Sequence, residues 1–309
     1  MANLLVRLLG KVLVALAVVT VCFSSWGMCI ACGDVGYYMY GNQGMTLPIP
    51  NKYKDLLILG MHPEYETDTM FSVREKASVR AAQNGNWAYE GEGWIFSIGR
   101  IDTARLHEML CEDMSGREVF ARDNGGNHYI YYHPTDVRYY RETAEQMAKD
   151  QEQWTKLNEW AWTSARKDFI GINSGLVPET FDNSEVAIYL NRILYKPNFN
   201  YTVSTVEYGP LKSTAVDPAP FVNQLLNGAT YEMVGQQEYP DGEYVVLNFP
   251  DEKTRLDFFL LEGKENYVRC VVHDEGAMLY KAHFTDAGIK ASKIMQEWYH
   301  ALAAKEITK

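Results

Sequence analysis

The residues best suited to chemistry in this sequence form three short clusters that combine histidine with tyrosine, carboxylate or cysteine side chains. In the first cluster, NHYIYYHP, Tyr129, Tyr131 and His133 share one face of an expected strand, because side chains alternate along a strand. Rings with polar rims can stack on a sugar or a peptide. We therefore predict a ligand-binding site at these residues, with core packing as the structural alternative.

The other two clusters contain potential metal ligands. His62, Glu64 and Glu66 directly follow an apolar run that is expected to be a buried strand, and together they are the predicted metal site. A solvated acidic loop is the alternative for this segment. His107 and Cys111 have the i, i+4 spacing of zinc ligands on a helix, but no third ligand follows at a matching spacing. We therefore interpret this pair as part of a helix surface on which the cysteine thiol is partly buried, and not as a metal site.

The first 31 residues have the pattern of an export signal. Arg7 and Lys11 precede VLVALAVVTVCF, an apolar run of 12 residues, whereas a bilayer span needs about 20. Cleavage before Cys32 would place that cysteine where bacterial lipoproteins are lipidated, so Cys32 is the predicted lipidation site. We predict that residues 1–31 are a signal peptide or membrane anchor. The protein is then secreted or attached to the cell envelope, and it associates with the membrane only through this segment.

Composition restricts the class of protein. The chain of 309 residues is 47% hydrophobic and 22% charged, which is ordinary for a folded globular protein. A net charge of −11 argues against nucleic-acid binding, because proteins that bind phosphate backbones usually carry a basic face. The sequence has no Gly-rich phosphate loop and no GxSxG motif. We therefore predict no cofactor and regard an enzyme as the less favoured interpretation.

Two cysteines, Cys111 and Cys270, lie outside the N-terminal segment. That number is too small for a disulfide-stabilised scaffold. We expect two separate buried thiols, and a disulfide between them in the exported protein is the alternative.

A hairpin and a long helix are expected to position the tyrosine cluster. The turn Asp123–Asn127 supplies residues that tolerate positive φ, as tight hairpin turns require. Pro134 ends the second strand because it has no N–H group, and Thr135 is the expected helix cap. Residues at 3–4 spacing predict a helix near 136–168, about 45 Å long, which either forms a spine for its domain or is broken once.

The clearest pattern lies in residues 213–309. Asp217 and Pro218 begin an expected helix, four strands of alternating polarity follow, and a last helix carries Trp298 on its apolar face. This order predicts a helix, a four-stranded antiparallel meander and a helix, packed as a two-layer sandwich. The expected fold class is α+β in two domains, an N-terminal α+β domain over 32–212 and the C-terminal domain over 213–309.

Several stretches resemble segments of exported bacterial proteins of unknown activity. They are MFSVREKASVRAA (70–82), GWIFSIGRID (93–102) and NHYIYYHPTDVRYYRE (127–142), and the likeness extends into EYGPLKSTAVDPAPFV and the terminal strands. The resemblance implies export and a bacterial envelope setting. It assigns no functional residue.

From these features we predict an exported cell-envelope protein with a non-catalytic role, which binds an unknown small molecule or protein. One alternative is a hydrolase or metal-dependent enzyme whose site is dispersed along the chain. Another is an inhibitor-like or structural module that uses the polar face of the C-terminal sheet against a protein partner. An exposed apolar sheet face or a cleft would distinguish these binding modes.

The export prediction can be tested by mass spectrometry of the protein recovered from the cell envelope or the medium. We expect a chain that begins after residue 31, with the added mass of a lipid if Cys32 is modified, or an intact chain that is bound to the membrane. A soluble cytoplasmic product that keeps residues 1–31 would contradict the prediction.

Overall fold

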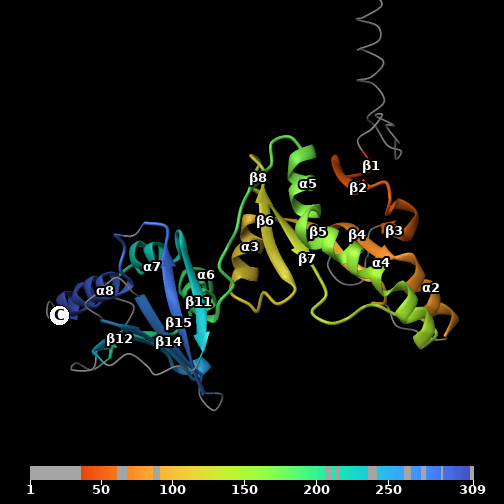
Figure 1. Cartoon of the computed structure of the whole chain (residues 1–309). Coiled ribbons are helices and arrows are strands. Elements are labelled where there is room, and N and C mark those ends of the chain that lie inside the picture. The colour runs from red at the N-terminus through yellow and green to blue at the C-terminus, as the bar shows by residue number, and fades with distance from the viewer. Residues whose placement is uncertain are drawn as a thin grey trace, which may run out of the picture. The chain divides into compact units, whose positions relative to one another are not determined.

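The protein, seen in a computed structural model, is an α+β protein with helices and antiparallel sheets (Figure 1). Its internal contacts divide it into two compact units, and each is described separately. Unit 1 comprises the chain up to Gly99 together with Asp136–Leu176, and unit 2 comprises Arg100–Thr135 together with Val177–Lys309. The structure describes residues 36–60, 68–85, 91–205, 210–212, 216–235, 242–260, 266–272, 276–286 and 288–306.

Unit 1 combines strands of two sheets with helices. Its elements are β1 (Tyr37–Asn42), β2 (Met45–Pro50), η1 (Lys54–Leu56), β3 (Leu57–Gly60), β4 (Thr69–Glu75), α2 (Lys76–Asn84), most of β5 (Trp94–Asp102), α4 (Ala144–Thr163) and α5 (Ala165–Ile172). β1 pairs with β2, whereas β4 lies between β3 and β5 with antiparallel register on both sides. Phe71 in β4 meets Phe169 in α5 edge to face, with centroids 5.9 Å apart, and this contact joins the strands to the helices.

Unit 2 combines a hairpin and a large sheet with helices. Its elements are α3 (Thr103–Leu110), β6 (Arg117–Arg122), β7 (Asn127–Tyr132), β8 (Val177–Pro178), α6 (Glu185–Tyr195), β9 (Thr202–Thr205), β10 (Leu211–Lys212), α7 (Ala219–Leu226), β11 (Ala229–Gly235), β12 (Tyr244–Phe249), η3 (Pro250–Glu252), β13 (Thr254–Phe259), β14 (Asn266–Val272), β15 (Gly276–Phe284) and α8 (Ala291–Glu306). The seven-stranded sheet has the order β10-β9-β12-β13-β14-β15-β11, and the six-stranded sheet has the order β3-β4-β5-β7-β6-β8.

The hairpin of β6 and β7 is confirmed. Asp123 Oδ1 accepts the N–H groups of Gly125 at 2.8 Å and Asn127 at 3.0 Å, and Gly126 adopts a φ of +80°, so the turn needs both the short carboxylate and the glycine. The register shifts between Val119 and Ala121. This bulge breaks the strict alternation that the sequence suggests.

The predicted helix near 136–168 is wrong at its start. α4 begins at Ala144, where Thr143 Oγ1 accepts the N–H of Gln146 at 3.2 Å, and Thr135 does not begin a helix. The residues before Thr143 are held in a non-helical path because Arg141 is buried in an ion pair with Glu75. The helical stretch has a single break, at Ser164 between α4 and α5, which matches the broken form of the prediction.

The predicted four-stranded C-terminal sheet is incomplete, because the sheet has seven strands. β12, β13, β14 and β15 are consecutive antiparallel neighbours, as the alternating pattern predicts. β9 adds to β12 through the pairs Val203–Leu247 and Thr205–Val245, and β10 extends that edge. β11 pairs with β15 at the opposite edge. Such non-local pairings leave no local sequence signal, so the pairing of residues 202–205 with β12 was not predicted.

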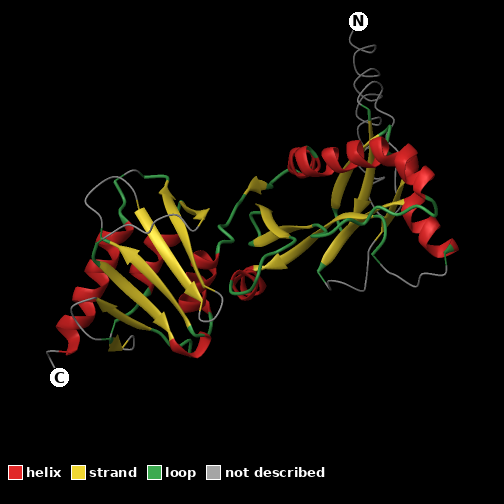
Figure 2. Ribbon diagram, turned by 60° about the horizontal axis from the view of Figure 1, so that its bottom comes forward, coloured by secondary structure: helices red, strands yellow, loops and turns green. Residues whose placement is uncertain are grey.

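One face of the seven-stranded sheet carries the core of unit 2, and Figure 2 shows helices on one side of this sheet. The buried residues of that face come from alternate strand positions, such as Val245, Leu256 and Cys270, and they cluster with residues of α6, α7 and α8. Trp298 of α8 is fully buried there and stacks on Phe221, with centroids 5.6 Å apart. The helices therefore form one layer and the sheet the other.

The core of unit 2 predicts which fragment can fold alone. A fragment of residues 180–309 should unfold in one cooperative thermal transition, since it keeps α6 and β9. A fragment of residues 213–309 should bind ANS and melt without cooperativity, because it lacks Leu190 and Val203, both 0% exposed in the core. Equal melting temperatures for the two fragments would contradict this prediction.

Candidate functional site

The predicted ligand-binding residues lie at the hairpin of unit 2. Tyr129 and Tyr131 are 0% and 1% exposed in β7, so neither ring offers a face to an incoming ligand. Tyr129 donates its hydroxyl to Asp123 Oδ2 at 3.2 Å, and Tyr131 packs edge to face on Phe120 with centroids 6.4 Å apart. His133 is half-buried, with Nδ1 3.2 Å from the carbonyl oxygen of the next residue. These contacts favour the core-packing alternative.

The other predicted sites lie in parts of the chain that the structure does not describe. His62, Glu64 and Glu66 lie outside the described residues, as do Cys32 and residues 1–31. Within the part of the chain that is described, no group of three or more His, Cys, Asp or Glu side chains is arranged to hold a metal ion. No described helix is both long and apolar enough to cross a bilayer. The metal site and the lipidation site at Cys32 therefore stay predictions.

The two cysteines are free thiols, as expected. Cys270 is buried with Sγ 3.3 Å from Glu185 Oε2, and Cys111 is half-buried at the end of α3. Burial raises the pKa of both thiols, which keeps them protonated and unreactive at neutral pH. His107, which shares a helix with Cys111, instead stacks on Tyr195 with centroids 3.7 Å apart and planes 10° apart.

A carboxylate, an imidazole and a hydroxyl meet in unit 2, although they are far apart in sequence. His128 Nδ1 lies 2.6 Å from Glu179 Oε2, and its Nε2 lies 3.2 Å from Thr103 Oγ1. His128 belongs to β7, Glu179 directly follows β8, and Thr103 is the first residue of α3. We call these three residues the Thr–His–Glu cluster. Sequence spacing could not reveal it, since 25 and 51 residues separate the partners.

The surroundings of the Thr–His–Glu cluster are polar and partly buried. Arg122 Nε lies 3.8 Å from Glu179 Oε1, which adds a cation on the far side of the carboxylate. Thr103 Oγ1 also lies 3.3 Å from the carbonyl oxygen of Gly126 in the hairpin turn. His107 stands one turn further along α3, where desolvation and the neighbouring His128 lower its pKa. His107 is therefore a neutral ring beside the cluster at pH 7.

The face of the seven-stranded sheet opposite α6, α7 and α8 is a second candidate site. We call it the outer sheet face, and its residues include Tyr244, Val246, Arg255, Asp257, Phe259, Tyr267, Arg269, Leu279, Lys281 and His283. Phe259 is 4% exposed, so this face is less wet than simple alternation suggests. Its buried residues surround a charged centre.

Asp257 and Arg269 form that centre. Asp257 is 0% exposed, and its Oδ2 lies 2.6 Å from both Nε and Nη2 of Arg269. Arg255 Nε lies 3.2 Å from Oδ1, but its geometry is not that of a hydrogen bond, and Oδ1 has no other hydrogen-bond partner among the described residues. The guanidinium of Arg269 lies 5.3 Å from the ring centroid of Tyr244 and 5.5 Å from that of Phe259. A buried carboxylate thus holds one arginine between two aromatic rings.

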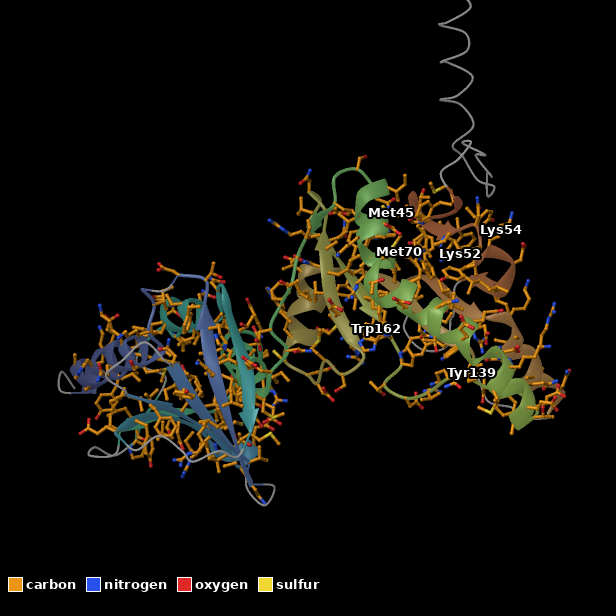
Figure 3. The ribbon with its side chains drawn as sticks, viewed as in Figure 1. Met45, Lys52, Lys54, Met70, Tyr139 and Trp162 are labelled. Atoms are coloured by element: carbon orange, nitrogen blue, oxygen red, sulfur yellow. The ribbon has the colours of Figure 1, made fainter. Side chains whose placement is uncertain are left out.

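Unit 1 contains a polar network whose donors are satisfied. Arg141 donates from Nη2 to Glu75 Oε1 at 2.7 Å, from Nη1 to Glu75 Oε2 at 2.9 Å and from Nε to Asp150 Oδ2 at 2.8 Å. Nη1 also reaches Ser78 Oγ at 2.8 Å. Tyr139, labelled in Figure 3, lies under the guanidinium with its ring centroid 4.6 Å away. This network ties the segment before α4 to β4 and α2, so its role is structural.

Comparison with known proteins adds no candidate: no protein-family model, curated protein or solved structure matches this chain. Function must therefore be argued from the geometry of the outer sheet face and of the Thr–His–Glu cluster.

The buried network of unit 1 gives a stability prediction. Arg141→Met should destabilise the protein by about 3–5 kcal/mol, because it leaves the Glu75 carboxylate buried without its partner. Lys156→Met is the matched control, since it breaks an ion pair with Glu152 in which the side chains are 59% and 79% exposed, and it should leave stability nearly unchanged. Urea unfolding of both variants is the measurement. Equal effects would show that the Arg141 pair is not a buried determinant of the fold.

Proposed function

We propose that this is an exported cell-envelope protein whose outer sheet face binds an acidic segment of a protein partner. The signal-like pattern of residues 1–31 supports export. The proposal includes a two-domain α+β fold. Its C-terminal domain is a two-layer sandwich that begins near Asp182, because Asp182 Oδ2 accepts the N–H of Tyr231 at 2.7 Å and so joins the start of the domain to β11.

The single observation that carries the binding proposal is the placement of Arg269 between Tyr244, Phe259 and Asp257. Arginine and tyrosine are enriched at the centres of protein interfaces, where an immobilised side chain loses little entropy on binding. Here the aromatic rings and the buried carboxylate already hold the guanidinium in one position.

Charge complementarity supports an acidic partner. The whole chain carries −11, yet the outer sheet face gathers the cations Arg255, Arg269 and Lys281 against the carboxylates Asp257 and Glu232. A basic patch on an acidic protein steers an acidic segment to that patch and repels it from the remaining surface. The basic side chains stand on the surface of a sheet, which suits a protein segment better than a small molecule. The inhibitor-like alternative would use the same face.

Charge reversal on the outer sheet face tests this proposal. A fluorescent peptide of alternating glutamate and tyrosine should bind the protein, with a Kd that rises with salt concentration. Arg255→Glu combined with Lys281→Glu should weaken binding at least about tenfold, as expected for removing complementary charges. Lys293→Glu on α8, whose side chain is 75% exposed on the helical layer, is the matched control and should leave the Kd unchanged.

Fluorescence anisotropy measures all three proteins. A Kd that does not change with salt concentration, or an equal loss of binding in Lys293→Glu, would contradict a site on the outer sheet face.

A further inference from the structure

The Thr–His–Glu cluster has the order of groups that activates a hydroxyl nucleophile. Glu179 Oε2 lies 2.6 Å from His128 Nδ1, so the carboxylate fixes the proton on that nitrogen. Nε2 then presents its lone pair to Thr103 Oγ1 at 3.2 Å. This distance is at the upper end of the range for a nucleophile and its general base in a protein without substrate. The arrangement is recognised by geometry and roles, not by sequence order.

His128, in the middle of the cluster, is its most buried member, and Thr103 is its most exposed one. Thr103 is exposed, whereas the side chains of His128 and Glu179 are 10% and 17% exposed. The nucleophile can therefore meet a substrate while the base and its carboxylate partner are shielded from water. Shielding strengthens the electrostatic interaction between the imidazole and the carboxylate.

Each member of the cluster stands on a fixed element. Asp102 Oδ1 accepts the N–H of Arg105 at 2.8 Å, which caps α3 and sets the position of Thr103. Glu179 donates its backbone N–H to the carbonyl oxygen of Phe120 at 3.1 Å, which anchors it to β6. The three side chains are thus held by a helix start and a hairpin and not by a long loop.

The same helix start can stabilise a developing oxyanion. The first N–H groups of an α-helix have no acceptor within the helix, and they carry the positive end of the helix dipole. Asp102 accepts the N–H of Arg105, and the other N–H groups of this first turn include those of Thr103 and Ala104. Donors placed where negative charge develops are a major contribution to acyl transfer.

From this geometry we infer that the cluster is an acyl-transfer site that hydrolyses small carboxylic esters, a function beyond the proposed binding role. Thr103 Oγ1 attacks the ester carbonyl carbon while His128 Nε2 takes the hydroxyl proton. The tetrahedral intermediate collapses, the bond to the alkoxy oxygen breaks, and His128 returns the proton to the leaving alcohol. Water then attacks the Thr103 ester with His128 as base, which releases the carboxylic acid and restores the hydroxyl.

The roles within the cluster differ. Thr103 and His128 touch the reacting atoms and are the catalytic residues. Glu179 acts through His128 and is a positioning residue. His107, one helical turn after Thr103 in α3, is a neutral ring stacked on Tyr195, and a neutral surrounding favours a small apolar acyl group over a charged one.

The experiment uses the full-length protein and p-nitrophenyl acetate. We expect release of p-nitrophenolate above the buffer rate and, after acid quenching, an acetyl group on Thr103 in the tryptic mass spectrum. Thr103→Val keeps the shape of the side chain and should reduce the rate about a hundredfold or more, the scale of a lost nucleophile and base pair. Thr103→Ser should retain activity. Ser115→Ala removes an exposed hydroxyl that donates to Asp113 Oδ1 at 2.7 Å in the same unit, and it should have no effect.

The positioning residue needs a readout beyond folding. Glu179→Gln should lower kcat with little change in KM and with a melting temperature close to that of the unchanged protein. An acetyl group on other residues, or equal rates for Thr103→Val and the unchanged protein, would overturn the inference. Peptide binding at the outer sheet face should survive Thr103→Val, so failure of one proposal does not imply failure of the other.

Discussion

The buried ion pair of Glu75 and Arg141 is the interaction on which the arrangement of unit 1 depends. Two charges shielded from water cost several kcal/mol each to desolvate, so the guanidinium can occupy this place only with its donors satisfied. The same carboxylate accepts the N–H of Ser78 at 3.3 Å and so caps α2. Glu75 also donates its N–H to the carbonyl oxygen of Gly93 at 2.6 Å. At Gly93 a Cβ would stand 2.5 Å from the carbonyl oxygen of Glu75, so the position requires glycine.

Local signals in the sequence were sufficient wherever one short segment determined the structure. The hairpin turn was predicted from its Asp, Asn and Gly residues. Asp102 and Ser184, which are residue types that favour helix N-caps, accept the N–H groups of Arg105 and Ala187. Prediction failed where a distant partner decided the outcome. The residues before Thr143 match a helical pattern, but the ion pair between Arg141 and Glu75 holds them in another conformation and so overrides that propensity. The sequence of β9 is typical of a strand, but β9 pairs with β12, which lies about forty residues later in the chain.

The candidate sites also divide into those with a local signal in the sequence and those without one. No local motif contains the Thr–His–Glu cluster, and His128 could be singled out in the sequence only as a histidine on a strand. Its neighbour on the opposite side of the alternation, Tyr129, attracted the ligand prediction because aromatic residues are conspicuous in sequence. Burial separates the two cases: the Tyr129 ring is fully enclosed, whereas the His128 imidazole lies between a partly buried carboxylate and an exposed threonine. The sequence predicted which side chains of β7 share a face, but it did not predict how deeply each face is buried.

Polar groups with a structural role can be distinguished from those with a functional role by how many of their hydrogen bonds are made within the protein. Burying a polar group is costly unless its hydrogen bonds are made, so departures from an apolar core need a compensating reason. At Arg141 the reason is the fold, since carboxylates, a hydroxyl and a carbonyl oxygen accept from all three guanidinium nitrogens. At Asp257 one carboxylate oxygen has no hydrogen-bond partner among the described residues, and at Thr103 the hydroxyl of an exposed residue lies beside a shielded imidazole and the carbonyl oxygen of Gly126. We therefore assign binding and catalysis to these two groups of unit 2, and we assign the network around Arg141 to structure.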